Sequence, residues 1–298
     1  MVNIGLVFAL ITAFCFAWSS LFMKKGMQKA STESGVFYTI IVNNLMFLFI
    51  IVPFLLIKGT PQINSAGVVF FILAGFLGPI LGRFSLYSSI RRIGATRSAS
   101  LKITAPVFSA ILAWILLKEF LSWNMALAII IIISGIYLVI SSPVRAEDGE
   151  ETKPQTKAGF GLGFLAAFFF AATNVSRKAG LQHIPSAIVG STLSAFAALI
   201  AFTIYHLIQG RLKQVLMIDK EAMIKFTYAG LLAGCATFSY FMALKFVPVS
   251  VGVALANVEP LFTIALAHLS GIDDEPITLK FISGAVVVLL GVTILVLS

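Results

Sequence analysis

Charge is what this sequence has least of. Only 11% of its 298 residues are charged, whereas a soluble domain carries about 25%, and the mean hydropathy is +1.02. So few charges cannot cover a water-soluble surface, and most of this surface must therefore face lipid. The net charge of +9 does not indicate nucleic-acid binding, because the basic residues are scattered at the ends of apolar segments, as is typical of membrane flanks.

The chain is also poor in the motifs of enzymes and metal sites. Its two cysteines, Cys15 and Cys235, lie inside apolar segments, and neither a CxxC motif nor a Cys/His metal spacing is present. The phosphate-binding loop of ATP-driven pumps, HExxH and Gly-x-Ser-x-Gly are missing too. All four aspartates lie in predicted loops, namely Asp148, Asp219, Asp273 and Asp274. We therefore predict no metal, no cofactor and no enzymatic activity.

Long apolar runs dominate what is present. A helix needs about 20 apolar residues to cross the hydrocarbon core, and the runs lack the period-two alternation of strands. The sequence predicts ten transmembrane helices, at residues 4–23, 36–57, 67–86, 98–117, 123–141, 159–176, 187–208, 224–244, 249–270 and 278–297.

The two halves of the chain resemble each other. Residues 4–28 align without a gap with residues 158–182 at an offset of 154, and the same offset carries Phe84 and Pro106 onto Phe238 and Pro260. We predict two five-helix repeats, 1–141 and 159–298, joined by a polar linker at 142–158. Five spans per repeat make the repeats inverted, and a duplicated hydrophobic half predicts a secondary transporter with its site between the repeats.

The basic residues suggest an orientation. Loops after odd-numbered spans carry twelve Lys and Arg and loops after even-numbered spans carry five. By the positive-inside rule, the odd loops and not the termini lie in the cytoplasm.

A family resemblance rests on two matching stretches. Residues 84–108 with Glu119, and residues 238–262 with Glu275, place small residues before a Pro-bearing helix and a Glu before the next one. With ten spans in two repeats, this resembles the EamA family of the drug/metabolite transporter superfamily. The resemblance implies export or exchange of metabolites or drugs, often proton-linked, with helices four and nine lining a central cavity. It also implies cytoplasmic termini, which conflicts with the charge count.

Glu259 is the candidate proton-coupling residue. It lies midway along the ninth span, where a charged, unpaired carboxylate would cost a few kcal/mol, so it is protonated, paired or facing water. The alternative is a buried structural hydrogen bond. Lys102, one turn into the fourth span, is a candidate substrate contact and a predicted partner of Glu259, although it could also extend toward the interface.

Other polar residues at membrane depth are candidate substrate contacts. Arg83 could bind carboxylate or phosphate in a bidentate fork or anchor the interface. Asn43 and Asn44 are adjacent on the second span, so at most one faces a cavity squarely.

The first helix of each repeat adds polar side chains. Trp18, Ser19 and Asn174 are candidate substrate contacts there, with hydrogen bonding between helices as the alternative. Asn257, two residues before Glu259, is a further candidate substrate contact.

Two prolines occupy matching positions inside spans. Pro106 and Pro260 each interrupt a helix and are candidate hinges, although a kink without function is the alternative. Glu119 and Glu275 are predicted to cap helix N-termini.

Glycines four residues apart occur three times. Gly78-x3-Gly82, Gly159-x3-Gly163 and Gly230-x3-Gly234 favour close helix packing within one bundle, with dimerisation as the alternative.

Together these features predict an all-α, multi-pass protein of the plasma or inner membrane. We expect proton-coupled export, by alternating access, of a small polar or amphipathic metabolite such as an amino acid. Its partners would be that substrate, the lipid bilayer and protons, without nucleic acid, and the protein would be a monomer or a weak homo-oligomer. A facilitative channel, an uncoupled exchanger and, less favoured, an intramembrane enzyme are the alternatives.

Overall fold

The computed structural model describes residues 2–59, 61–93, 98, 101–140, 157–270 and 279–297. All the regular structure in these ranges is helical, which confirms the predicted fold class. By length and composition, seven helices could cross a membrane: Asn3–Met27, Thr32–Lys58, Ser65–Ile90, Lys157–His183, Ala187–Ile208, Lys220–Phe246 and Val249–Leu269. Three shorter apolar helices are Ala105–Leu117, Trp123–Val139 and Leu279–Ile294. Each of the ten predicted segments thus contains an apolar helix, while the count of ten spans stays a prediction.

The helices of the first half follow the predicted segments. They are α1 (Val2–Met27), α2 (Thr32–Lys58), α3 (Ser65–Phe76), the π-helix η1 (Leu77–Gly82), α4 (Arg83–Ile93), α6 (Ala105–Leu117) and α7 (Trp123–Ile140). Side-chain caps fix two of the starts, because Ser31 accepts a hydrogen bond from the Ser34 amide before α2, and Asn64 accepts one from the Ala66 amide before α3.

The second half repeats this order. It consists of α8 (Lys157–His183), α9 (Ala187–Ile208), the short α10 (Leu212–Leu216), α11 (Lys220–Phe246), α12 (Val249–Ala256), α13 (Glu259–Leu269) and α14 (Leu279–Leu297). Helix α8 begins inside the predicted linker and runs to His183, well past the predicted end at residue 176. The rest of that linker, 142–156, and Glu275 lie outside the described residues.

Two spans are interrupted at matching places, as the prolines predicted. Helix α12 ends at Ala256 and α13 begins at Glu259, with Pro260 in its first turn. In the first half, the backbone turns at Thr104, whose amide bonds the Leu101 carbonyl, and α6 begins at Ala105. Proline fits the first turn of a helix because the backbone N–H that it lacks would have no intrahelical acceptor there.

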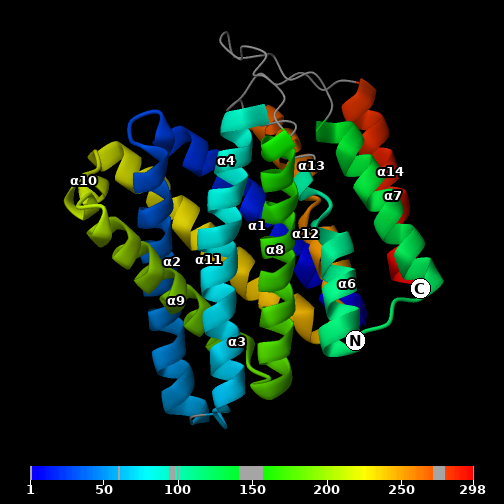
Figure 1. Ribbon diagram of the computed structural model, residues 1–298, viewed down its shortest axis with the longest axis horizontal. Coiled ribbons are helices and arrows are strands. Elements are labelled where there is room, and N and C mark those ends of the chain that lie inside the picture. The colour runs from blue at the N-terminus through cyan, green and yellow to red at the C-terminus, as the bar shows by residue number, and fades with distance from the viewer. Residues whose placement is uncertain are drawn as a thin grey trace.

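The halves interlock in one bundle. Helix α1 packs against α11, α8 packs against α3 and α4, and α7 pairs with α14 at one edge (Figure 1). The first helix of each half therefore lies against the third span of the other half. Any site between these helices is built from both halves.

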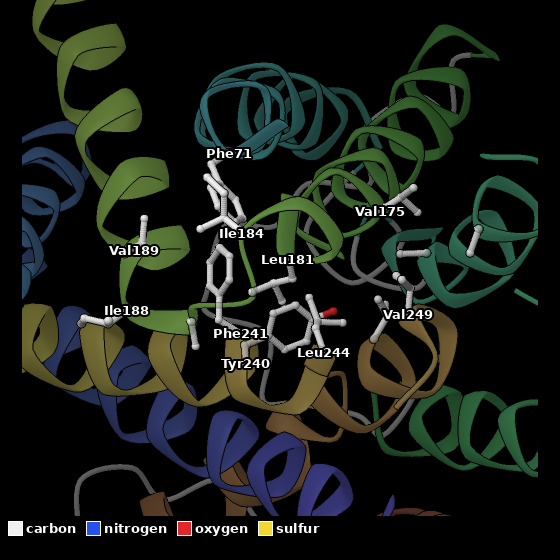
Figure 2. Close-up of a cluster of buried hydrophobic side chains, with 14 of the residues drawn as sticks. Phe71, Val175, Leu181, Ile184, Ile188, Val189, Tyr240, Phe241, Leu244 and Val249 are labelled. Carbon is white, nitrogen blue, oxygen red and sulfur yellow. The ribbon is translucent and has the colours of Figure 1, made fainter. Parts of the chain in front are cut away.

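Buried apolar side chains hold the second half to α3. Phe71 of α3, Leu181 of α8, Ile188 of α9 and Phe241 of α11 belong to one buried cluster (Figure 2). The rings of Phe71 and Phe241 meet edge to face, with 5.8 Å between centroids, a favoured aromatic geometry. This cluster fixes the position of α8 against α3 and α9.

Corresponding glycines make corresponding contacts in the two halves. A Cβ on Gly35 would lie 2.7 Å from the ring of Phe226, and one on Gly190 would lie 2.8 Å from the ring of Phe71. Both pairs are related by an offset of 155, as are Gly75 and Gly230 at the α3–α9 and α11–α2 contacts. The duplication seen in the sequence is thus repeated in the packing.

The π-helix η1 accounts for a one-residue difference between the halves. Gly75 and Gly230 match at an offset of 155, whereas Ser85 and Ser239 match at 154, so the first half has one extra residue between these points. Residues 77–82 form a π-helix there, while α11 is an uninterrupted α-helix. A π turn accommodates one more residue than an α turn, and such turns often occur at functional sites.

The glycine pairs pack inside the bundle. A Cβ on Gly78 would meet Thr173, one on Gly163 would meet Leu101, and one on Gly230 would meet Val42. Packing within one bundle is therefore confirmed for these three glycines.

Candidate functional site

A cavity of about 140 Å³ lies where the two halves meet. Its walls come from α1, α2, α3, η1 and α4 of the first half and from α8, α9 and α11 of the second. The lining residues are Phe16, Thr39, Ile40, Asn43, Asn44, Gly75, Pro79, Arg83, Arg177, Ser194, Ala195, Ala198, Ala233 and Thr237.

Most of the lining consists of residues related by the repeat. At the offset of 155 that relates α2 to α9, the pairs are Thr39 with Ser194, Ile40 with Ala195, and Asn43 with Ala198. At the offset of 154 beyond the π-helix, Arg83 pairs with Thr237. Because both members of each pair line the cavity, it lies at the junction between corresponding surfaces of the two halves.

Arg83 brings a positive charge into this cavity. It is the first residue of α4, directly after the π-helix, and it is partly buried. No hydrogen bond or ion pair joins Arg83 to another described residue, since the ion pairs among these residues are Lys29–Glu221 and Lys178–Glu119. Arginine stays protonated in proteins, so the cavity carries a cation without a counter-ion among the described residues.

Arg177 is a second cavity cation that the sequence analysis missed. The sixth span was predicted to end at residue 176, so Arg177 was counted as a loop residue, but α8 continues past it. Its Nη1 donates to Asn174 Oδ1 at 3.4 Å, and its guanidinium lies 5.6 Å from the ring centre of Tyr240 and 5.4 Å from that of Phe241. These aromatic faces stabilise the cation at this position.

Two amide side chains of α2 complete the polar part of the lining. Asn44 donates from Nδ2 to the carbonyls of Ile40 (2.8 Å) and Ala195 (3.0 Å), which fixes the direction of its amide. Asn44 is 4% exposed, and its Oδ1, like that of Asn43, is buried without a partner in the described part of the chain. Both asparagines line the cavity, whereas the sequence predicted that at most one of these neighbours would face a cavity squarely.

The predicted contact between Lys102 and Glu259 does not form. Lys102 Nζ lies 5.2 Å from the ring centre of Phe170 on α8, and Glu259 Oε1 accepts a hydrogen bond from Ser20 of α1 at 2.8 Å. Each of the two interrupted spans thus packs on the first helix of the other half, which separates their side chains. Neither residue lines the cavity.

The remaining candidates lie in contacts between and within helices. Ser19 donates to the Ala229 carbonyl of α11 at 2.8 Å, and Trp18 stacks on Phe22 at 5.8 Å between centroids. Asn174 accepts from Arg177, so it borders the cavity through that residue. Asn257 directly follows the last residue of α12 as its C-cap, and its buried Nδ2 has no partner among the described residues.

An ion pair joins the halves at the end of α6. Glu119 Oε1 lies 3.6 Å from Lys178 Nζ, and its Oε2 accepts from the Val249 amide at 3.0 Å. Lys178 also donates to the carbonyls of Leu244 and Val247. The prediction that Glu119 caps a helix is confirmed, but the helix is α12 of the second half and not the following α7. No group of three or more His, Cys, Asp or Glu that could hold a metal ion occurs within the described ranges.

Comparison with known proteins identifies the family. The EamA-like transporter family matches this chain twice, over residues 3–141 and 157–297. Human Solute carrier family 35 member G1 is 25% identical over 231 residues, which make up 77% of this chain and 59% of the human protein. The mouse protein of the same name is 28% identical over 142 residues, or 47% of this chain and 37% of the mouse protein. The match therefore spans less than two thirds of either relative's length.

The fold recurs in a solved structure. A crystal structure of a protein superposes with a TM-score of 0.74 over 98% of this chain and 96% of the other, at 13% sequence identity. That likeness shows the fold alone. The two family matches and the helical bundle lead to one conclusion: the chain belongs to the EamA-like transporter family.

Proposed function

We propose that this transporter moves a small polar metabolite of amino-acid size across the cell membrane by alternating access, with the cavity between the halves as its substrate site. The observation that carries this proposal is the cavity lining, which consists largely of residue pairs related by the repeat. Inverted repeats, which five spans per half imply, generate inward-open and outward-open states from one fold when one half rocks against the other.

The interrupted spans support the same motion. Breaks at Thr104 and at Asn257–Val258, each followed by a proline, divide the fourth and ninth spans at matching places. Non-helical backbone at membrane depth is tolerated where it is buried in protein or lines water, and it supplies hinges. Pro106 and Pro260 are the hinge positions of this proposal.

Glu259 is the proposed proton-coupling residue. It starts α13 beside the helix break, is partly buried, and accepts from Ser20 of α1. A carboxyl group at membrane depth is costly unless it is paired or has access to water, which makes Glu259 a candidate for a proton relay. Because its partner is on the first helix of the other half, movement between the halves would alter that access.

Flux in proteoliposomes tests the proposal. Purified protein is reconstituted with an internal pH-sensitive dye and exposed to amino acids, sugars, nucleosides and cationic drugs, with Glu259→Gln as the variant and Glu221→Gln, at an exposed site, as the matched control. We expect saturable solute entry that is coupled to proton movement. Glu259→Gln should lose this coupling, and Glu221→Gln should keep it.

The outcomes separate the alternatives. Solute flux without proton movement would indicate an uncoupled exchanger or facilitator and would leave Glu259 a structural role. Flux that does not saturate would indicate a channel. A failure of every solute class to cross would refute the proposed transport of small polar metabolites.

A further inference from the structure

The cavity holds more positive charge than the acidic side chains of the described residues compensate. Arg83 and Arg177 line it, and none of its fourteen lining residues is acidic. The rest of the lining is neutral: hydroxyl and amide side chains, alanines, a glycine, a proline, Phe16 and Ile40. Two guanidinium groups at membrane depth, where ionised groups are expensive unless paired, need negative charge from another source.

From this arrangement we infer that the cavity binds a small organic anion with two acidic groups and at least one N–H or O–H donor, such as an acidic amino acid or a hydroxydicarboxylate. This inference rests on the proposed function, because it specifies the substrate class of the same cavity.

The two acidic groups follow from the donors of the two arginines. Arg83 takes part in neither ion pair of the described residues, and Nε of Arg177 is buried without a hydrogen-bond partner among them. A guanidinium presents its donors in a planar fork that matches the two oxygens of a carboxylate. One carboxylate satisfies one fork, so two separate arginines are best satisfied by a dianion.

The donor group follows from two acceptors. Asn44 Oδ1 is buried without a partner among the described residues, and both hydrogen bonds of its Nδ2 hold the amide in place. Asn43 Oδ1 is likewise buried and has no partner in this part of the chain. A buried acceptor left without a partner costs about 1–3 kcal/mol. A hydroxyl or ammonium group on the ligand would remove this cost, and a plain dicarboxylate would not.

The size of the ligand follows from the volume. Pockets for drug-sized ligands occupy about 300–1,000 Å³, whereas this cavity measures about 140 Å³. The apolar part of the lining suits a short carbon skeleton between the two acidic groups.

The test compares each acid with its own half amide, which has nearly the same shape but one charge fewer. Binding of aspartate, glutamate and malate to the detergent-purified chain is measured by thermal shift against asparagine, glutamine and malamate, and uptake of the same pairs is measured in proteoliposomes. A charged hydrogen bond contributes enough to change affinity about 10- to 100-fold. We expect at least one acid to bind that much more tightly than its half amide.

Variants assign the preference to the two arginines. Arg177→Gln and Arg83→Gln should each reduce the ratio between acid and half amide to about one, whereas Arg92→Gln, at an exposed position on the same helix as Arg83, should leave it unchanged. Arg83→Lys keeps the charge and loses the fork, so it should retain an intermediate ratio. If a glutamine variant does not insert, the acid-to-amide ratio of the unmodified chain still decides the question.

Three results would overturn the inference: equal binding of every acid and its half amide, stabilisation by chloride or sulfate as strong as by any of the acids, or a preference that survives both Arg→Gln variants. Its failure is distinguishable from that of the proposed function. Saturable uptake of half amides without a preference for acids would keep the transporter and refute the dianion site. Tight binding of an acid without any uptake would support the site and refute the transport cycle.

Discussion

Replacing Glu119 tests whether a buried ion pair holds the two halves of this protein together. Glu119 and Lys178 are only 17% and 15% exposed, and Glu119 also accepts from the first amide of α12. Losing a helix-capping acceptor costs about 1 kcal/mol. Removing one partner of a fully buried ion pair costs about 3–5 kcal/mol, but residual exposure and the carbonyl partners of Lys178 reduce that contribution here.

We therefore expect Glu119→Ala to destabilise the protein by about 2–3 kcal/mol. Glu119→Gln keeps the acceptor for the Val249 amide and loses only the charge, so it should cost about 1–2 kcal/mol. At about 2 °C per kcal/mol for a chain of this size, thermal unfolding in detergent should shift down by about 4–6 °C for alanine and about 2–4 °C for glutamine.

The second ion pair of the described residues supplies the control. Lys29 and Glu221 are 53% and 60% exposed, and exposed pairs contribute little because water and salt screen them. The hydrogen bond from Lys29 to Glu221 raises the pKa of Lys29. Any stabilisation from this hydrogen bond is present at neutral pH and is lost as the pH rises through the raised pKa of Lys29. Glu221→Gln at pH 7 therefore reports the full contribution of an exposed ion pair. We expect its shift in unfolding temperature to be below detection.

A double-mutant cycle completes the experiment. Glu119→Gln and Lys178→Gln should be non-additive, because each removes the same interaction. Equal shifts for Glu119→Gln and Glu221→Gln, or strict additivity of Glu119→Gln and Lys178→Gln, would refute the claim that the buried pair holds the halves together.

Three further predictions follow from the packing and the helix breaks. Gly75→Ala should abolish stable folding, because a Cβ there would overlap the Ser194 carbonyl and lie 2.7 Å from a side chain of α9, whereas the control Gly161→Ala places its Cβ in open space and should be neutral. Size-exclusion profiles of the two variants test this prediction. A normal profile for Gly75→Ala would contradict the close α3–α9 contact. Glu259→Gln should abolish the pH dependence of flux while leaving the unfolding temperature within about 2 °C of the parent, and flux that still follows pH would remove this carboxyl from coupling. Pro260→Ala should extend the helix across its break and slow net flux several-fold without weakening substrate binding, and unchanged flux would remove the hinge role.

The sequence was least informative about which polar residues meet. Arg83, Asn43 and Asn44 were found because a polar side chain inside an apolar run is conspicuous. Arg177 was missed because it follows the apolar run, and its position depends on aromatic faces of Tyr240 and Phe241 more than sixty residues away in sequence. Its spacing of three residues from Asn174, on the same face of a helix, was the one local signal available.

Sequence alone determined the class of this protein. Scarce charge, apolar runs of membrane length and a duplicated pattern are properties of the chain itself, and they sufficed for the all-helical bundle, the two matching proline breaks and the family. The tertiary structure decided the site. It separated Lys102 from Glu259, assigned Glu119 to a helix of the other half, and brought Arg83 and Arg177 to one cavity. The physical reason is that lipid selects each span by composition, independently of its neighbours, whereas contacts between side chains depend on helix rotation and register. A single π turn or a few extra helical residues change the rotation and register of a helix, and neither can be detected in a hydropathy profile.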